Sequence, residues 1–249
     1  MSTNKYHPRF NSGRWPRRKM MAGFFSILLP FSMASTAQFP WIDGASALTS
    51  AEKERTLIQV QSIVQKKLPA SYQAQAIQIS QFIFDHAIQH NIDPLLVTAV
   101  ITHESRFRPQ IRGRHGEIGL MQIKPSTAQW LWKREYKTSL PKNFNLKSPI
   151  QNIQIGVMYL AYLQERLQSK VSGEQLHIAI LSTYNMGPDN WLKLVKARKK
   201  PKIYSSKVLH IYQSYRKTAR SATTETWNLA KNSKDPKRKL QGSVLSWMF

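Results

Sequence analysis

Helix start signals recur along this chain, and no segment with the alternating apolar and polar residues of a β-strand lies between them. Thr49 and Glu52 have the spacing of a capping box and predict a helix that runs to about Lys67. Asp93 followed by Pro94 is a helix cap with proline in the first turn, where the missing N–H costs nothing. These signals predict an all-α domain.

The remaining expected helices show apolar residues at helical spacing. Ser148 and Gln151 have capping-box spacing around a proline at the first helical position, and Ser172 and Gln175 open a helix that stops at Gly187. The expected segments are 73–90, 95–103, one from Pro125, one from Pro149, 172–185 and 205–217. Beyond Ser221 the sequence is polar and basic, which predicts a flexible tail over residues 220–249.

The first 37 residues have the order of a secretory signal. Basic residues within 14–19 precede an apolar stretch at 20–33, which is short for a membrane span, and small residues follow up to Ala37. We therefore expect a signal peptide at 1–37, with the signal itself at about 14–37, and an exported, periplasmic protein without a stable span after cleavage. An uncleaved amphipathic anchor is the alternative. Residues 38–70 then form an N-terminal extension with the first helix.

The charge of the chain indicates a polyanionic partner. The formal net charge is +24, and the segment 1–37 contains six of the basic residues and no acid, so the rest would still carry +18. Charge alone does not choose among nucleic acid, an anionic membrane and an acidic wall polymer. The expected signal and the lack of a recognisable basic recognition helix argue against nucleic acid. The chain has no cysteine, which excludes disulfides and thiolate metal sites.

A single acid stands out at the end of an apolar helix. Glu104 follows the segment 95–103, where a carboxylate is costly unless it is neutralised, hydrogen-bonded or functional. A turn-rich loop with Gly113, Gly116 and Gly119 comes next, and glycine lets backbone approach a ligand closely. The pattern predicts a cleft with one acid in its wall.

Five motifs follow one another in the chain. They are Glu104-Ser105-x-Phe107-x-Pro109, Gly119-Leu120-Met121-Gln122-Ile123-x-Pro125-x-Thr127-Ala128, Asn152-Ile153-x-x-Gly156-x-x-Tyr159-Leu160, Tyr184-Asn185-x-Gly187-Pro188, and Tyr204 with Lys207-Val208-Leu209. Together they resemble the transglycosylase SLT domain of family 1 lytic transglycosylases, relatives of goose-type lysozyme, and the resemblance extends over roughly residues 77–215.

The resemblance implies a lysozyme-like helical domain with a substrate cleft, at residues 71–219, that cleaves the MurNAc–GlcNAc bond of peptidoglycan. It implies that Glu104 is the catalytic residue and that no cofactor or metal is needed. The substrate-binding residues that it implies are Met121, Gln122, Tyr184, Asn185, Ser105 and Tyr204. His86 and His90 have i, i+4 spacing, but a third ligand at useful spacing is absent from the sequence around them.

The chain departs from the family pattern in three places. Gly113 stands where the family often has a substrate-contacting serine, Glu117 stands where alanine is usual, and Lys199-Lys200 stands where some members have an acid. We interpret Glu117 as a solvated loop residue paired with Arg112 or Arg114, and a second acid of the cleft is the alternative. The departures leave the acid Glu104 in place.

The resemblance implies that one glutamate serves as acid and then as base. It protonates the glycosidic oxygen, and its carboxylate then takes the proton of the muramyl C6 hydroxyl, which attacks the anomeric carbon and gives a 1,6-anhydro product. Such an acid needs a pKa of roughly 6–7 rather than about 4.3, which apolar neighbours can supply. The alternatives are hydrolysis by a goose-type lysozyme-like enzyme and a catalytically degenerate wall-binding assembly protein. Family members of this size also act with secretion or conjugation machines, which makes such an apparatus a candidate partner.

Overall fold

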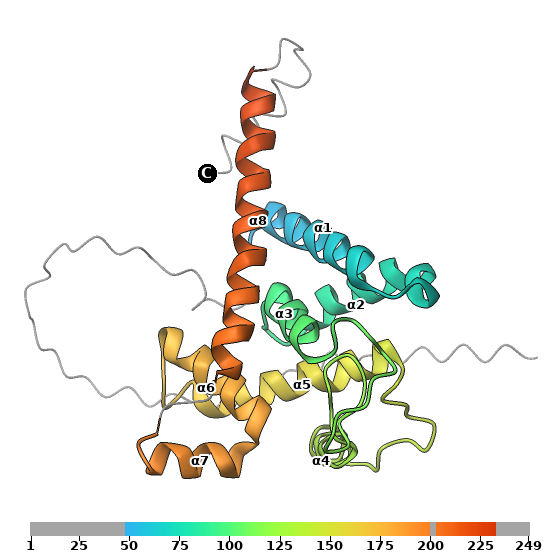
Figure 1. The fold of residues 1–249 in the computed structure, drawn as a ribbon, viewed down its shortest axis with the longest axis vertical. Helices are drawn as coiled ribbons and strands as arrows, with labels where there is room; N and C mark the ends of the chain where they lie inside the picture. The colour runs from blue at the N-terminus through green and yellow to red at the C-terminus, as the bar shows by residue number, and fades with distance from the viewer. Residues whose placement is uncertain (1–47, 200–202, 233–249) are drawn as a thin grey trace, which may run out of the picture. The chain divides into compact units, whose positions relative to one another are not determined.

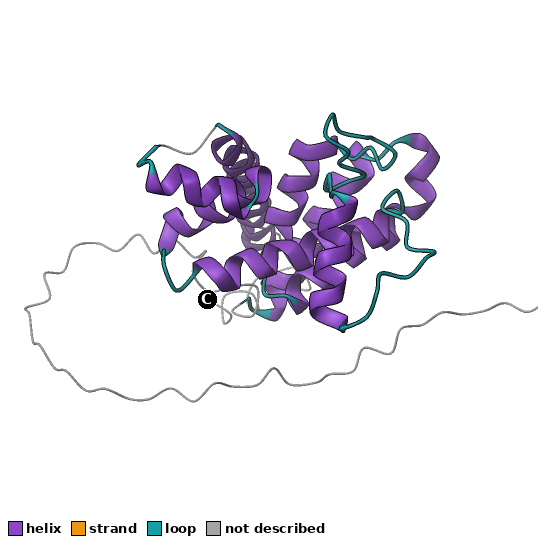
Figure 2. Cartoon of the chain, turned by 90° about the horizontal axis from the view of Figure 1, so that it is seen from below, coloured by secondary structure: helices purple, strands orange, loops and turns teal. Residues whose placement is uncertain are grey.

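The computed structural model describes residues 48–199 and 203–232, and the expected signal at 1–37 lies outside these ranges. Its regular elements are helices, which confirms the all-α prediction for the described residues (Figure 2). The elements are α1 (Ser50–Lys67), the 3-10 helix η2 (Ala70–Gln75), α2 (Ala76–Gln89), α3 (Pro94–Ser105), α4 (Pro125–Tyr136), α5 (Pro149–Leu167), α6 (Gly173–Met186), α7 (Pro188–Lys196) and α8 (Tyr204–Asn232). Within these ranges no helix combines the length and apolar content needed to cross a bilayer.

Two of the predicted helix starts are made as expected. The Thr49 side chain accepts from the N–H of Glu52, and the Glu52 carboxylate accepts from the N–H of Thr49, so the capping box opens α1. At α3 the Asp93 carboxylate accepts from the N–H of Leu95 at 2.8 Å. These bonds fix where the two helices begin.

Helix α3 forms the centre of the fold and positions its own last turn. Residues 94–101 are all buried, because α1, α2 and α8 pack around the helix (Figure 1). A helix that is apolar on every side is expected only in a core. Helix α8 runs along α3 and also contacts α6 and α1, so residues near both ends of the sequence reach the same core.

Several boundaries differ from the sequence-based predictions. Ser148 makes no side-chain cap, and the Gln151 side chain accepts from the N–H of Asn145 at 2.7 Å instead of closing a box. Ser172 is the N-cap residue of α6 but likewise makes no side-chain bond. The helix expected from residue 73 begins as the 3-10 turn η2, and α8 continues to Asn232, well past its expected end.

Helix α7 was not predicted. It follows Gly187 directly, with Pro188 at its first position, so the glycine that ends α6 also starts the next helix. In the sequence, Gly187-Pro188 indicates only the end of a helix. The short α7 instead turns back beside α6 and carries Asn190 to the site described below.

Candidate active site

Glu104 lies in the last turn of α3, where the chain leaves the helix in an unusual conformation. Arg106 (φ 51°) and Phe107 (φ 60°) both have left-handed backbone, and Phe107 is fully buried. Such φ values are strained for residues other than glycine and are common at functional sites. The buried Phe107 anchors the exit of the helix and thereby fixes the acid that precedes it.

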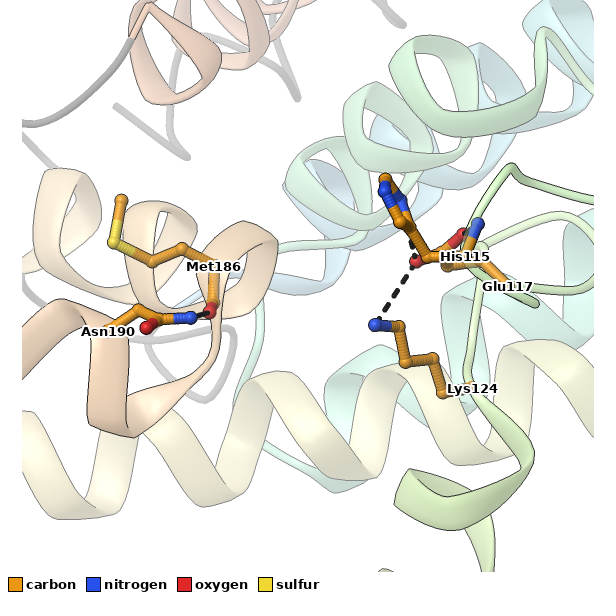
Figure 3. A network of polar contacts seen from close by, with 5 residues as sticks. All are labelled: His115, Glu117, Lys124, Met186 and Asn190. Carbon is orange, nitrogen blue, oxygen red and sulfur yellow. Dashed lines mark hydrogen bonds and ion pairs between the residues drawn. The ribbon is translucent and has the colours of Figure 1, made fainter.

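A cleft of about 590 Å³ opens beside Glu104. One wall is the loop that follows α3, and the other is the junction of α6 and α7. Figure 3 shows His115, Glu117 and Lys124 on the loop side facing Met186 and Asn190 on the other. The lining residues are Glu104, His115, Glu117, Gln122, Ile123, Lys124, Thr127, Tyr159, Tyr184, Asn185, Met186, Gly187 and Asn190.

The carboxyl group of Glu104 is set up to hold a proton near neutral pH. Burial raises its pKa from 4.5 to about 7, a hydrogen bond from Tyr204 opposes this rise, and the nearby charge of Glu117 adds to it. The Tyr204 hydroxyl donates to Glu104 Oε1 at 2.5 Å. A pKa near 7 lets one group donate a proton and later accept one.

Gln122 is held on the loop wall by its own side chain and by a strained backbone. Its φ is 48°, and its amide nitrogen donates to the carbonyl oxygens of Gly119 at 2.9 Å and Ile111 at 3.3 Å. Gly119 has φ 81°, and a Cβ there would lie 2.4 Å from the Asn152 amide. The turn therefore needs glycine, for its conformation and for its space.

Asn152 of α5 fixes this loop from behind. Its buried side-chain oxygen accepts from the N–H of Met121 at 2.7 Å, and its amide donates to the carbonyls of Ile118 and Leu146 at 2.8 Å each. All three bonds go to backbone groups that water cannot reach, so the amide decides the path of the loop.

The structure gathers most of the predicted site residues. Glu104, Gln122, Tyr184 and Asn185 line the cleft. The Tyr184 hydroxyl donates to the Met121 carbonyl at 2.8 Å, which ties α6 to the loop. That hydroxyl is therefore engaged within the protein, and Tyr184 offers its ring to the cleft.

Three predicted substrate-binding residues do not line the cleft in this structure. The Met121 side chain is fully buried and packs against Gly156, so it lies behind the cleft wall. Ser105 is buried, and its hydroxyl donates to the Ile101 carbonyl at 3.1 Å. Neither residue lines the cleft. The spacing of the motifs does not reveal this, because it does not tell to which side of the backbone a side chain points. Tyr204 contacts the acid and is absent from the cleft lining.

The predicted ion-pair partners of Glu117 are wrong. Its carboxylate lies 3.4 Å from Lys124 Nζ and 3.8 Å from His115 Nδ1, in place of the arginines at 112 and 114. The turn through Gly116 (φ 85°) brings His115 back beside Glu117. Local spacing identified the loop but not the direction of its side chains.

Two residues of the cleft lining are not among the predicted site residues. Tyr159 belongs to α5, where the sequence shows it only within a motif, and Asn190 belongs to the unpredicted α7. Tyr159 and Tyr162 lie three residues apart on α5, and this spacing does not indicate that one of the two rings faces a cleft.

The two histidines with i, i+4 spacing do not form part of a metal site in the described residues. His86 and His90 pack against each other with ring centroids 4.6 Å apart, and burial lowers the pKa of His86 to about 4. In the part of the chain that the structure describes, no group of three or more His, Cys, Asp or Glu residues gathers.

Comparison with known proteins gives consistent matches. The family model of the transglycosylase SLT domain matches residues 81–207, just over half of the chain. The endo-type membrane-bound lytic murein transglycosylase A of Klebsiella pneumoniae is 31% identical over 114 residues, which are 45% of this chain and 56% of that protein. The membrane-bound lytic murein transglycosylase E of Buchnera aphidicola is 30% identical over 118 residues, 47% of this chain and 53% of that protein.

The chain thus spans about half the length of the curated relatives that it matches. Among solved structures, an inactive mutant of the lytic transglycosylase Slt from Pseudomonas aeruginosa aligns with a TM-score of 0.47 and 20% identity. That alignment covers 64% of this chain and 27% of the other.

Proposed function

Because this chain belongs to the transglycosylase SLT domain family, we propose that it is a lytic transglycosylase that cleaves the MurNAc–GlcNAc bond of peptidoglycan. The lysozyme-like arrangement that the resemblance implies is part of this proposal. The observation that supports it most directly is the position of Glu104, whose carboxyl group lines the cleft and has its pKa raised to about 7. The names of the relatives support the same reaction.

In the proposed first step, protonated Glu104 gives its proton to the glycosidic oxygen. The bond between that oxygen and the anomeric carbon breaks, and the electron pair leaves with the oxygen. Burial raises the pKa of Glu104 to about 7, because it disfavours the charged form, so a substantial fraction of the acid holds its proton at neutral pH. The hydrogen bond from Tyr204 stabilises the carboxylate that this transfer creates.

In the second step the Glu104 carboxylate takes the proton of the muramyl C6 hydroxyl. The freed oxygen bonds to the anomeric carbon and closes a 1,6-anhydro ring, and Glu104 is protonated again. The nucleophile belongs to the substrate, so no water has to be captured and oriented. One carboxyl group with a pKa near 7 suffices for both transfers.

A second candidate reaction is hydrolysis in the same cleft, and Glu117 favours it. Glu117 is another carboxylate of the cleft wall, and most glycosidases use a second carboxylate to activate water or to stabilise the sugar cation. Its ion pair with Lys124 favours the charged form that such a base needs. The two reactions give different products, because an anhydro sugar is lighter by one water than a reducing end.

The experiment is the digestion of purified sacculi by the wild type and by Glu104→Gln, followed by mass spectrometry of the released muropeptides. We expect anhydro products from the wild type and a loss of at least about 1000-fold in the variant. The matched control is Glu165→Gln, which changes an exposed glutamate paired with Arg134 outside the cleft. Reducing-end products alone would favour hydrolysis, and retention of a tenth of the activity by Glu104→Gln would exclude its role as the acid.

We further propose that the enzyme works in the cell envelope, exported by the expected signal at 1–37. The net charge of +24 suits an anionic wall, and the matched relatives are named as membrane-bound. Local wall opening for a secretion or conjugation apparatus is the role that the resemblance implies. Fractionation of cells that express the full chain, with and without residues 1–37, tests the location.

A further inference from the structure

At Gly113, which has no side chain, two side-chain oxygens of neighbouring residues lie close to the backbone. A Cβ at this position would lie 2.3 Å from Glu117 Oε2 and 2.8 Å from Gln122 Oε1. Gly113 is not among the glycines with positive φ, so its backbone conformation suits any residue. Glycine is therefore required here for steric reasons, because the two oxygens occupy the place that a side chain would take.

Glu117 is held in this place by three groups. The N–H of His115 donates to Oε2 at 3.0 Å, and Lys124 Nζ and His115 Nδ1 lie 3.4 Å and 3.8 Å from Oε1 (Figure 3). Partial burial opposes the charged form of Glu117, but hydrogen bonds from its own N–H, His115 and Lys124 outweigh burial and lower its pKa. The group is a carboxylate at neutral pH and can only accept hydrogen bonds.

Gln122 presents the second acceptor. Its amide nitrogen already donates to the carbonyls of Ile111 and Gly119, so the nitrogen faces the loop and Oε1 faces the space over Gly113. Both residues line the cleft that contains Glu104. The cleft wall therefore offers two neighbouring acceptors, one of them charged, which suits a ligand with two neighbouring donors and repels an anion.

We propose that Glu117 and Gln122 form, over Gly113, a subsite that selects a 2-acetamido sugar with a free 3-hydroxyl group, as in GlcNAc. Such a sugar carries an amide N–H and an O–H on adjacent carbons, one donor for each acceptor. A muramyl residue lacks the second donor, because its O3 is an ether, and the lactyl group on that oxygen would crowd Glu117. The proposal rests on the proposed function for the presence of a glycan in the cleft, and it assigns Glu117 a role in specificity.

The test measures binding rather than cleavage. The probe is the GlcNAc tetrasaccharide, titrated calorimetrically into the full chain carrying Glu104→Gln, which should not turn it over. Adding Glu117→Ala should weaken binding by about tenfold or more, since a hydrogen bond to a charged group is lost. The control pair is Glu104→Gln with Glu165→Ala, which removes an ion-paired glutamate outside the cleft and should bind as the parent does. Equal affinity with and without Glu117, or no binding by the parent, would overturn the proposal.

A substitution at Gly113 provides a second test, in which two losses of affinity should not add. Gly113→Ser should weaken tetrasaccharide binding as much as Glu117→Ala does, because the new Cβ displaces the carboxylate. In a chain that already carries Glu117→Ala, the serine should cost nothing further, and losses that simply add would contradict the shared site. Melting temperatures show that each variant is folded. The two proposals can fail separately: sacculi left intact by the wild type would refute the activity, whereas unchanged tetrasaccharide binding without Glu117 would refute the subsite alone.

Discussion

The hydroxyl of Tyr204 donates a hydrogen bond to Glu104 Oε1 at 2.5 Å, which joins the first residue of α8 to the last turn of α3. The ring of His103 packs edge-on against the ring of Tyr204, with centroids 4.9 Å apart. Three effects act on the pKa of the acid: burial and the nearby charge of Glu117 raise it, and the hydrogen bond from the tyrosine lowers it. Burial is the largest effect, and the resulting pKa of Glu104 is about 7.

The first prediction concerns Tyr204→Phe. Without the hydroxyl, nothing offsets burial at Oε1, so the pKa of Glu104 should rise further and the alkaline limb of the pH profile should move to higher pH. The maximal rate should fall about tenfold, because the variant no longer stabilises or orients the carboxylate formed in the first step. The measurement is kcat/KM for glycan release between pH 4 and pH 9.

Tyr215→Phe is the matched control for that experiment. The Tyr215 hydroxyl is 2.8 Å from the Thr102 hydroxyl and also connects α8 to α3, but it does not contact Glu104. The control should cost similar stability and leave the alkaline limb in place. An alkaline limb that moves to lower pH in Tyr204→Phe would contradict the assigned role.

The second prediction is a pH-dependent gain in stability for Glu104→Gln. The folded-state pKa of about 7 lies above the ordinary value of 4.5, so between these values the folded state binds more protons than the unfolded state. The free energy of unfolding of the wild type should therefore fall as pH rises from about 4.5 to 7. Glutamine does not titrate, so at pH 8 the free energy of unfolding of the variant should exceed that of the wild type by on the order of 2–3 kcal/mol.

Urea denaturation at pH 4 and pH 8 measures this difference. The histidines are shared by both proteins, so their titration cancels when the two free energies are subtracted. Glu165→Gln, at a side chain that is 57% exposed, should show no comparable gain. A difference between wild type and Glu104→Gln that is the same at both pH values would refute the raised pKa.

The third prediction concerns the amide that holds the loop. Asn152→Leu removes three hydrogen bonds at once and leaves a backbone N–H and two carbonyls buried without partners. We expect a loss of about 3 kcal/mol or more in the free energy of unfolding, measured by urea denaturation. In Asn190→Leu only one exposed bond to the Met186 carbonyl is lost, and the cost should stay below about 1 kcal/mol. Equal costs would show that the loop does not depend on Asn152.

The sequence predicted the features that depend on neighbouring residues along the chain. The caps at Thr49 and Asp93 were foreseen because each is a local exchange of hydrogen bonds. Glu104 was expected in a cleft wall because it stands between an apolar helix and a glycine-rich loop, and it lines the cleft, while its catalytic role stays a prediction. The capping box predicted at Ser148 is not formed. The Gln151 side chain accepts from the N–H of Asn145 instead, and the residue spacing alone does not reveal this contact.

The direction of side chains around the loop depends on tertiary contacts. Met121 and Ser105 share their motifs with cleft residues, yet both side chains point inward. Met121 packs against Gly156 of α5, and the Ser105 hydroxyl donates to a backbone carbonyl of its own helix. The bond between Tyr204 and Glu104 joins positions 100 residues apart, and no local pattern encodes it. Glu117 paired with Lys124 because the turn at Gly116 reverses the chain beneath it.

The fourth prediction tests the packing behind the cleft through Gly156 of α5. An alanine Cβ there would lie 2.2 Å from Met121 Sδ and 2.7 Å from its Cε, while the Met121 side chain is fully buried. Alanine improves helix propensity by roughly 0.5–1 kcal/mol, but overpacking of a full core costs about 1–3 kcal/mol. Gly156→Ala alone should therefore be destabilising. Activity should fall with it, because Met121 directly precedes Gln122 of the cleft wall.

A double-mutant cycle separates the two terms. Met121→Ala alone leaves a cavity and should cost about 2–5 kcal/mol. Once the methionine is gone, Gly156→Ala meets empty space, so only its helix propensity remains and the second change should be neutral or stabilising. The four proteins are compared by urea denaturation, with a coupling energy of at least about 1 kcal/mol expected. If the two costs add, Met121 does not press on Gly156, and the close approach of the loop to α5 would need another cause.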